Sequence, residues 1–169
     1  DALILDSGCG TGDSSMLLAS QYPNHIVIAI DKSFARLQKL NETDLPANLV
    51  LLRADQFDFW RLAAQQQWSF QIHTIFYPNP WPKKKHVLRR IYAHPAFPSL
   101  LKISKQLVLR SNWKLYVAEF CYAYHLATGG SCDFQQITPN PIKTLFEKKF
   151  LASGHSLYEV KLEPDFVEE

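Results

Sequence analysis

The stretch from Tyr77 to Arg90, YPNPWPKKKHVLRR, joins a proline-rich aromatic turn to a block of Lys and Arg side chains. Proline fixes φ and stiffens the turn, so such a loop can hold an acceptor atom in line with a reactive group. Tyr77 and Trp81 offer aromatic faces for stacking a base or contacting a cation. The segment therefore indicates a catalytic loop with a nucleic-acid handle beside it.

The basic block comprises Lys83, Lys84, Lys85, His86, Arg89 and Arg90. We expect a helix over 83–93, which would place Lys85 and Arg89 on one face because they are four residues apart. Each phosphate that such a block neutralises releases counterions and adds salt-sensitive affinity. A run of charge is often only solvated surface, and it is the neighbouring turn that favours contact with RNA.

A second segment, LILDSGCGTG from Leu3 to Gly12, is a strand that runs into a glycine-rich turn. The glycines allow a sharp bend and the close approach of a ligand. Their spacing is GxGxG, which differs from the GxGxxG dinucleotide fingerprint. The same glycines would also serve a tight strand-to-helix turn without a ligand. The candidate cofactor-binding residues of this turn are Asp6, Gly8, Cys9, Gly10 and Gly12.

Acidic residues stand at the ends of the first three predicted strands, namely Asp6, Asp31 and Asp55. At the carboxyl edge of a parallel sheet, a carboxylate such as Asp31 can accept hydrogen bonds from both ribose hydroxyls. Asp55 would face an adenine edge. The series suits an adenosyl ligand with an amino-acid end and no phosphate, which favours S-adenosylmethionine over NAD. The alternative is that the acids only cap the following helices.

Apolar runs alternate with amphipathic segments along the chain. This rhythm predicts an α/β, Rossmann-like fold with a mostly parallel seven-stranded sheet and helices on both faces. The last two strands, with one helix between them, indicate an altered sheet edge. Strands are expected at 2–6, 25–31, 48–54, 70–77, 113–120, 131–137 and 156–163, and helices at 13–21, 33–41, 57–66, 83–93, 97–108 and 143–152.

The composition bounds the possible classes of protein. A chain of 169 residues with 47% hydrophobic and 20% charged residues is typical of one globular domain, and we expect a single domain over 1–169. No apolar run approaches the roughly 18 residues of a membrane span. Because the chain starts at its first strand, we expect an N-terminal extension to be missing. The sequence leaves the oligomeric state unknown.

The cysteines and histidines show no metal-ligand spacing. Cys9, Cys121 and Cys132 follow no signal peptide, so we expect a reducing, cytoplasmic setting without a disulfide framework. His25, His73 and His125 lie beside apolar elements, and we assign them to packing. We therefore predict no metal.

Two segments resemble one family. PNPWPKKKHVLRR resembles the PDPWPKKRHxxRR signature of the bacterial tRNA (guanine-N7)-methyltransferases, which methylate a guanine in the tRNA variable loop. KTLFEKKFLASGH resembles the family's TxxE segment and the glycine that follows it. The match spans nearly the whole chain, and its proline-tryptophan part is specific, whereas GCGTG marks methyltransferases generally. The resemblance implies a class I methyltransferase fold, S-adenosylmethionine as cofactor and tRNA as partner.

Residue by residue, the resemblance implies cofactor roles for Asp6, Gly8, Gly10, Asp31 and Asp55. It implies tRNA or guanine roles for Lys83, His86, Arg89, Arg90, Thr144 and Glu147. Their place in the loop adds Tyr77 to the cofactor set and Trp81 to the substrate set. As catalytic residues we expect Asn79, Glu119 and Glu147.

Three residues differ from the family pattern. Asn79 stands in place of an aspartate, Asp6 replaces a glutamate, and Glu119 falls where the family usually has an aspartate after the fifth strand. Guanine N7 has a lone pair and no proton, so its methylation needs alignment and accommodation of charge, not a general base. An asparagine cannot place a negative charge near the developing cation, a loss of roughly 1 to 3 kcal/mol.

Glu119 or Glu147 could compensate for that loss. Glu147 with Thr144 is the candidate for reading a flipped guanine, because a carboxylate accepts well from the N1 and N2 donors of the base. Two further functions stay open. Asn79-Pro80-Trp81 faintly resembles the NPPY-type loop of exocyclic-amine methyltransferases, although the single proline argues against it. The chain could also be a catalytically weakened RNA-binding protein that keeps the cofactor site.

Overall fold

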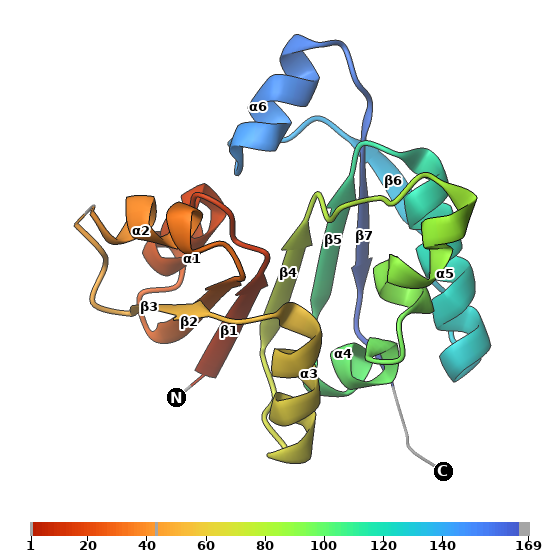
Figure 1. Cartoon of the computed structure of the whole chain (residues 1–169), viewed down its shortest axis with the longest axis horizontal. Coiled ribbons are helices and arrows are strands. Elements are labelled where there is room, and N and C mark those ends of the chain that lie inside the picture. Colours follow the sequence, from red (N-terminus) through yellow and green to blue (C-terminus); the bar gives the residue numbers. More distant parts are fainter. Residues whose placement is uncertain (1, 43, 166–169) are drawn as a thin grey trace.

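The computed structural model describes residues 2–42 and 44–165 and shows one sheet flanked by helices (Figure 1). The strands are β1 (Ala2–Ser7), β2 (His25–Asp31), β3 (Leu49–Arg53), β4 (Ile72–Phe76), β5 (Leu107–Ser111), β6 (Phe134–Ile137) and β7 (Leu157–Leu162). The helices are α1 (Asp13–Gln21), α2 (Phe34–Asn41), α3 (Gln56–Gln65), α4 (Phe97–Ile103), α5 (Lys114–Thr128) and α6 (Leu145–Ala152), with short 3₁₀ helices η1 (Lys84–Arg89) and η2 (Ile91–Ala93).

The seven strands lie in the order β3-β2-β1-β4-β5-β7-β6. Strands β1 to β5 are parallel, whereas β7 runs antiparallel between β5 and β6. The predicted mostly parallel sheet and its altered edge are confirmed. The carboxyl ends of β1 to β5 meet at one edge of the sheet, which is where such folds bind ligands.

Each face of the sheet packs against its own set of helices. Successive side chains of a strand point to opposite faces, so Ile4 packs with Leu18 of α1 and Leu37 of α2. The next residue, Leu5, belongs to the larger core formed with α3, α4 and α5, which includes Trp60. Every residue of β4 and of β5 is buried, as expected for central strands of a sheet covered on both faces.

The fifth strand differs from the prediction. Residues 113–120, expected as a strand, lie in α5, and the strand is Leu107–Ser111, which overlaps the end of the helix predicted at 97–108. The buried residues of α5 follow the helical period of 3.6, not the alternation of a strand; they are Tyr116, Val117, Phe120, Cys121 and Tyr124. The LVLRS run is instead a fully buried strand.

The basic segment also differs from the prediction. The single helix expected over 83–93 is two 3₁₀ helices, η1 and η2. A 3₁₀ helix has about three residues per turn, so residues four apart, such as Lys85 and Arg89, do not share a face. The residues of the basic block therefore do not lie together on one face of a single helix.

Two cysteines pair, contrary to the expectation of no disulfide framework. Cys121 of α5 and Cys132, which precedes β6, form a disulfide. Gly129 ends α5 in the left-handed conformation and turns the chain back toward that helix, which brings the two sulfurs together. Cys9 is free and buried. Among the described helices, none has the length and apolar character that crossing a membrane would require.

Candidate active site

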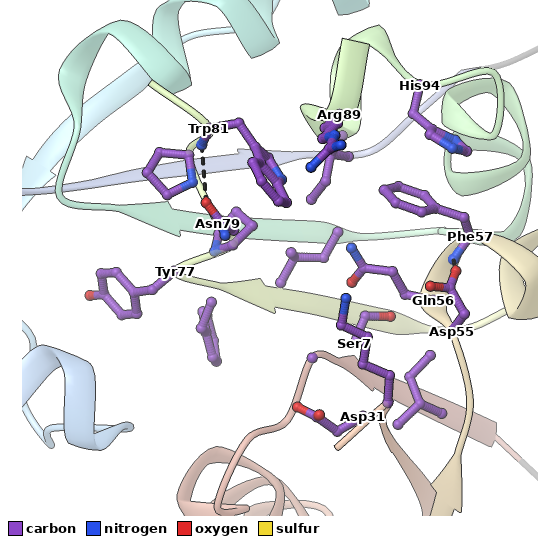
Figure 2. A pocket seen from close by; sticks show the side chains of 18 of the residues that line it. Ser7, Asp31, Asp55, Gln56, Phe57, Tyr77, Asn79, Trp81, Arg89 and His94 are labelled. Carbon is purple, nitrogen blue, oxygen red and sulfur yellow. Dashed lines mark hydrogen bonds between the residues drawn. The ribbon is translucent and has the colours of Figure 1, made fainter. Parts of the chain in front are cut away.

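A cavity of about 970 Å³ lies at the carboxyl edge of the parallel strands, a size within the roughly 300–1,000 Å³ of ligand pockets. We term its two walls the glycine side (Ser7, Gly8, 30–32, Arg36 and 54–57) and the loop side (75–81, Leu88, Arg89, Ile91, His94, Pro95, Asn112, Phe146 and Phe150). Figure 2 shows Asp31 and Asp55 on the first wall and Asn79 and Trp81 on the second. Strands one to five all contribute, as a ligand site of this fold requires.

The glycine turn bends through left-handed backbone at Gly8, Gly10 and Gly12, with φ of 71°, 59° and 83°. The amides of Gly8 and Cys9 donate to the Ile30 carbonyl at 2.8 and 3.0 Å. A Cβ at Gly8 or Gly10 would meet only one side-chain atom, at 3.8 or 4.0 Å, whereas one at Gly12 would lie 2.2 Å from Leu40 Cδ2. Gly8 therefore leaves backbone open to the cavity it lines, and Gly12 is required by the packing of α2.

Asp6 lies behind the cavity wall, not on it. Its side chain accepts from the hydroxyls of Ser14 and Ser15, both at 2.6 Å, and from Thr74 Oγ1 at 2.8 Å. Burial raises the pKa of Asp6, and the three hydroxyl donors oppose that shift. The carboxyl group ties α1 and β4 to the glycine turn. Cys9 is also buried, and burial raises the pKa of its thiol.

Asp31 and Asp55 both line the cavity and both bind backbone amides. Asp31 accepts from Gly10 N at 3.0 Å and Ser33 N at 2.8 Å, and Arg36 Nη1 lies 3.3 Å from its Oδ2. Asp55 caps α3, with Oδ1 accepting from Phe57 N at 2.9 Å. Asp55 therefore both caps α3 and lines the cavity. Sequence reasoning missed the neighbouring lining residues Lys32, Arg36, Gln56, Phe57 and His94.

The loop after β4 is held in a strained form. Tyr77 and Trp81 have positive φ, 53° and 45°, which non-glycine residues rarely adopt. Asn79 Oδ1 accepts from Trp81 N at 3.1 Å (Figure 2). The Arg89 guanidinium lies 4.8 Å from the Trp81 ring centroid, and the His86 ring meets the Trp81 ring edge-on at 5.4 Å. The structure therefore brings three of the predicted substrate residues together at the rim.

The buried Arg90 pairs with the partly exposed Glu119 beneath this loop. Arg90 is 5% exposed, and its Nε and Nη2 both donate to the Trp81 carbonyl at 3.2 Å. Its Nη1 donates to Glu119 Oε2 at 2.5 Å, and Glu119 also accepts from the Tyr92 hydroxyl. Neither residue lines the cavity. Their interactions instead fix the backbone at Trp81.

The residue after the fifth strand is Asn112, because that strand ends at Ser111. The expectation that Glu119 occupies this position is wrong, since Glu119 lies within α5. This error followed from the prediction of the fifth strand at 113–120. Asn112 lines the cavity, as does Asn79. Both positions where the resemblance predicts an acid near the target base therefore carry neutral amides.

Glu147 is fully buried, and both its oxygens bind protein donors. Its Oε1 accepts from the Tyr77 hydroxyl at 2.9 Å and from Arg110 Nη1 at 2.6 Å, while Oε2 accepts from Lys143 N at 2.6 Å. Thr144 Oγ1 accepts from Glu147 N at 3.1 Å, so the TxxE segment forms a capping arrangement at the start of α6. In Figure 2 the Tyr77 ring points away from the other labelled side chains.

Arg110 connects this carboxylate to a second one. Its Nε donates to Glu159 Oε2 at 2.7 Å, and the guanidinium lies 5.2 Å from the Phe76 ring centroid. Burial opposes ionisation of Glu159, yet Arg110 holds the pKa of Glu159 below its usual value. Burial and the adjacent Glu147 raise the pKa of Tyr77, so its phenol stays protonated as a donor. Strands β5 and β7 thereby hold α6 against the loop side.

The exposed lysines Lys83, Lys84 and Lys85 lie outside the cavity lining, in the same segment as Trp81, His86 and Arg89.

His73 is buried between two hydroxyls, with Nε2 2.7 Å from Ser7 Oγ and Nδ1 2.8 Å from Ser104 Oγ. Over residues 2–42 and 44–165, no group of three or more His, Cys, Asp or Glu side chains could hold a metal ion.

The sheet order, with an antiparallel seventh strand between β5 and β6 and a glycine turn after β1, defines a class I methyltransferase fold. Solved structures agree. The 16S rRNA methyltransferase KamB matches with a TM-score of 0.69 at 18% identity, over 97% of this chain and 89% of that one. The 16S rRNA (adenine(1408)-N(1))-methyltransferase of Catenulisporales acidiphilia, with cosubstrate SAM, has a TM-score of 0.65 at 14% identity, over 99% and 89%.

The chain belongs to the family whose model is described as "Putative methyltransferase", which matches residues 1–160. A tRNA (guanine-N(7)-)-methyltransferase of Mycobacterium avium is 31% identical over 133 residues, 76% of this chain and 49% of the relative. One of Neisseria meningitidis is 26% identical over 166 residues, 93% of this chain and 69% of the relative. The chain thus spans about half the length of the first relative.

Proposed function

We propose that this chain transfers a methyl group from S-adenosylmethionine to N7 of a guanine in the tRNA variable loop. The observation that carries the proposal is one cavity with the glycine turn, Asp31 and Asp55 on one wall and the Asn79 to Arg89 loop on the other. The names of the relatives, tRNA (guanine-N(7)-)-methyltransferase, support the choice of substrate.

The glycine side fits S-adenosylmethionine, whose sulfonium supplies an electrophilic methyl group when bound. Gly8 presents backbone without a Cβ, and Asp31 and Asp55 place carboxylates for ribose and adenine. Phe57 adds an apolar wall. Arg36, which pairs with Asp31, has a side chain that is 46% exposed, so it can move away when ribose hydroxyls take up that carboxylate.

The loop side has the task of orienting guanine and excluding water, because N7 needs no proton removed. Trp81 and Arg89 offer a planar face and a charge at the rim. Asn79 and Asn112 offer amide donors and acceptors. Glu147 then acts as a positioning residue through Tyr77, since its oxygens are already engaged with Tyr77, Arg110 and Lys143. Arg90 and Glu119 have the same kind of role toward Trp81.

The product identifies the reaction. The full-length protein is incubated with radiolabelled S-adenosylmethionine and unmodified tRNA, and the digested RNA is analysed for its methylated nucleoside. We expect 7-methylguanosine. Methylation of an exocyclic amine would overturn the proposal in favour of amine chemistry. No product despite binding of cofactor and tRNA would favour a weakened RNA-binding protein.

The amine alternative depends on Asn79. An NPPY-type loop uses its asparagine oxygen to accept from the target amino group, and Asn79 Oδ1 has one of its two lone pairs engaged by Trp81 N at 3.1 Å. The argument for weakened catalysis is that Asn79 and Asn112 are both neutral. A carboxylate at position 79 would stabilise the cation that develops on the purine by roughly 1 to 3 kcal/mol.

Asn79→Asp tests that point. We expect it to raise the rate of guanine methylation about 5- to 150-fold, which corresponds to that stabilisation. The measurement is single-turnover methyl transfer with saturating tRNA. The matched control is Asn41→Asp, an exposed position at the end of α2, where no change is expected. An unchanged rate in Asn79→Asp would mean that the amide suffices for full activity.

We also propose that the chain acts as one domain over 1–169 in the cytoplasm, with tRNA as partner. One sheet and two core clusters join residues 2–42 and 44–165, which supports a single domain. Residues 1, 43 and 166–169 of the predicted domain lie outside the described ranges. Limited proteolysis of the full-length protein, expected to leave one core fragment, tests the single domain.

A further inference from the structure

Three aromatic rings form a continuous stack at the mouth of the cavity. Phe146 and Phe150 of α6 lie 5.9 Å apart with ring planes 23° from parallel, and Phe150 and His155 lie 5.3 Å apart at 14°. His155 closes one end of the stack, where its Nδ1 lies 3.1 Å from Asn112 Nδ2. Phe146 and Phe150 line the cavity together with Asn112. The stack is therefore anchored at one end and bordered by the proposed acceptor site.

The other end of the stack is open. Phe146 is 48% exposed, and its neighbours Ile142 and Leu145 are 48% and 56% exposed. Lys148 and Lys149 of the same helix are also exposed. The acid of this helix, Glu147, is buried and paired with Arg110, so the exposed polar side chains of the helix are cationic. An apolar ring bordered by cations matches a nucleobase between its phosphates.

Phe146 lines the same loop side of the cavity as Arg89, which belongs to the basic block. Figure 1 shows α6 beyond the upper ends of β4 and β5, separate from the helices that cover the two faces of the sheet. Arg89 and the lysines Lys83, Lys84 and Lys85 belong to the segment that follows β4. A single strand of RNA whose target base enters the cavity would therefore meet cations both in the segment after β4 and at Lys148 and Lys149 of α6.

We propose that the exposed face of Phe146 is a stacking platform for a base of the RNA strand adjacent to the methylated nucleotide. The inference rests on the proposed function, and it adds a second contact to the RNA on the α6 side. Stacking of a base on an aromatic side chain is independent of sequence. The platform therefore adds affinity for an unpaired nucleotide without selecting its identity.

Substitution of Phe146 tests the platform through tRNA binding. Phe146→Ala is expected to weaken the Kd for unmodified tRNA about 5- to 150-fold, the range for loss of one base-aromatic stack. Phe146→Leu, which keeps apolar surface but removes the ring, is expected to weaken it similarly, and Phe146→Tyr is expected to bind like wild type. Phe34→Ala removes a ring that is 60% exposed on α2 and serves as the matched control.

A fluorescent base reports the stacking directly. In tRNA carrying 2-aminopurine beside the target guanine, wild-type protein is expected to quench the fluorescence, and Phe146→Ala to leave it unquenched. The Kd for S-adenosylmethionine, measured by calorimetry, is expected to stay unchanged in all Phe146 variants. Thermal melting of each variant checks that it is folded.

The outcomes separate the two proposals. If wild type neither methylates nor binds tRNA, the proposed function fails and the platform fails with it. If wild type makes 7-methylguanosine and Phe146→Ala binds tRNA equally well, only the platform is overturned. Full affinity in Phe146→Leu would also overturn it, because apolar surface alone would then suffice. Loss of self-association in Phe146→Ala with unchanged tRNA binding would assign the patch to a second copy of the chain.

Discussion

The two walls of the cavity are built by different interactions. On the glycine side, backbone geometry sets the shape, through left-handed glycines and amides that donate to Ile30 and Asp31. On the loop side, ion pairs of buried arginines set it, since Arg90 binds Glu119 and Arg110 binds Glu147 and Glu159. The first wall therefore depends on residues that lack side chains, and the second on side chains that would be destabilising without their partners.

Removal of the buried Arg110 guanidinium should give the largest difference in stability between the two walls. Arg110→Met leaves the buried Glu147 without a cationic partner and Glu159 with only the exposed Lys161, and we expect a loss of about 3 to 5 kcal/mol in the free energy of unfolding. Arg36→Met removes the half-exposed partner of the buried Asp31 on the glycine side, but Asp31 keeps the amide donors of Gly10 and Ser33. We therefore expect a smaller change in stability, about 0 to 1 kcal/mol. Urea unfolding of both variants at pH 7.5 measures the difference. Equal losses would contradict the contrast between the walls.

A glycine-to-alanine substitution should lower stability most on the glycine side. Gly12→Ala combines left-handed backbone with overlap onto Leu40, and we expect it to lower stability by about 2 to 4 kcal/mol. Gly129→Ala has the same kind of φ, but nothing lies within 4 Å of its Cβ, so only the backbone cost of about 1 to 2 kcal/mol applies. If thermal unfolding shows equal losses, the packing of α2 against the turn does not matter.

His73 lies between Ser7 and Ser104, beneath both walls, and should give the smallest effect. Burial lowers the pKa of His73 to about 3, so the folded state keeps it neutral while the unfolded state protonates it below about pH 6.5. Its contribution is full above that pH and falls as the pH drops toward 3. We expect a loss of about 2 kcal/mol between pH 6.5 and 5, measured by urea unfolding.

Three other groups bear on the acid side of this pH dependence. Glu159 has its pKa held low, so its contribution is lost as the pH falls from the usual carboxylate pKa toward its lowered value. Burial raises the pKa of Asp6, so protonation of Asp6 opposes the loss. His94 has its pKa lowered by burial and by Arg61, so it adds a loss of the same sign as that of His73. His73→Gln separates the two histidines, because it should flatten the pH dependence. An NMR titration of wild type that finds His73 changing protonation near pH 6.5 would contradict the prediction.

The sequence predicted the glycine side better than the loop side. The bounds of β2 and α1 match the prediction, because apolar strands and a glycine turn leave local signals. A short buried run such as LVLRS cannot be told from a buried helix by periodicity alone. The fifth strand was therefore predicted at the wrong place, and Asn112 was not recognised as the residue that follows it. The sequence also could not show that Arg90 is buried, because its partner Glu119 lies 29 residues away.

The connection between β6 and β7, residues 138–156, leaves the sheet and returns to the same edge, and it carries α6 on the way. Strand order and the glycine turn do not depend on the path that this connection takes. The proposed RNA contact of Phe146 can therefore change, by substitution or by insertion, while the glycine turn proposed to hold the methyl donor is preserved. In a lineage of such proteins, this one connection can acquire a different RNA contact provided that it keeps Glu147 paired with Arg110.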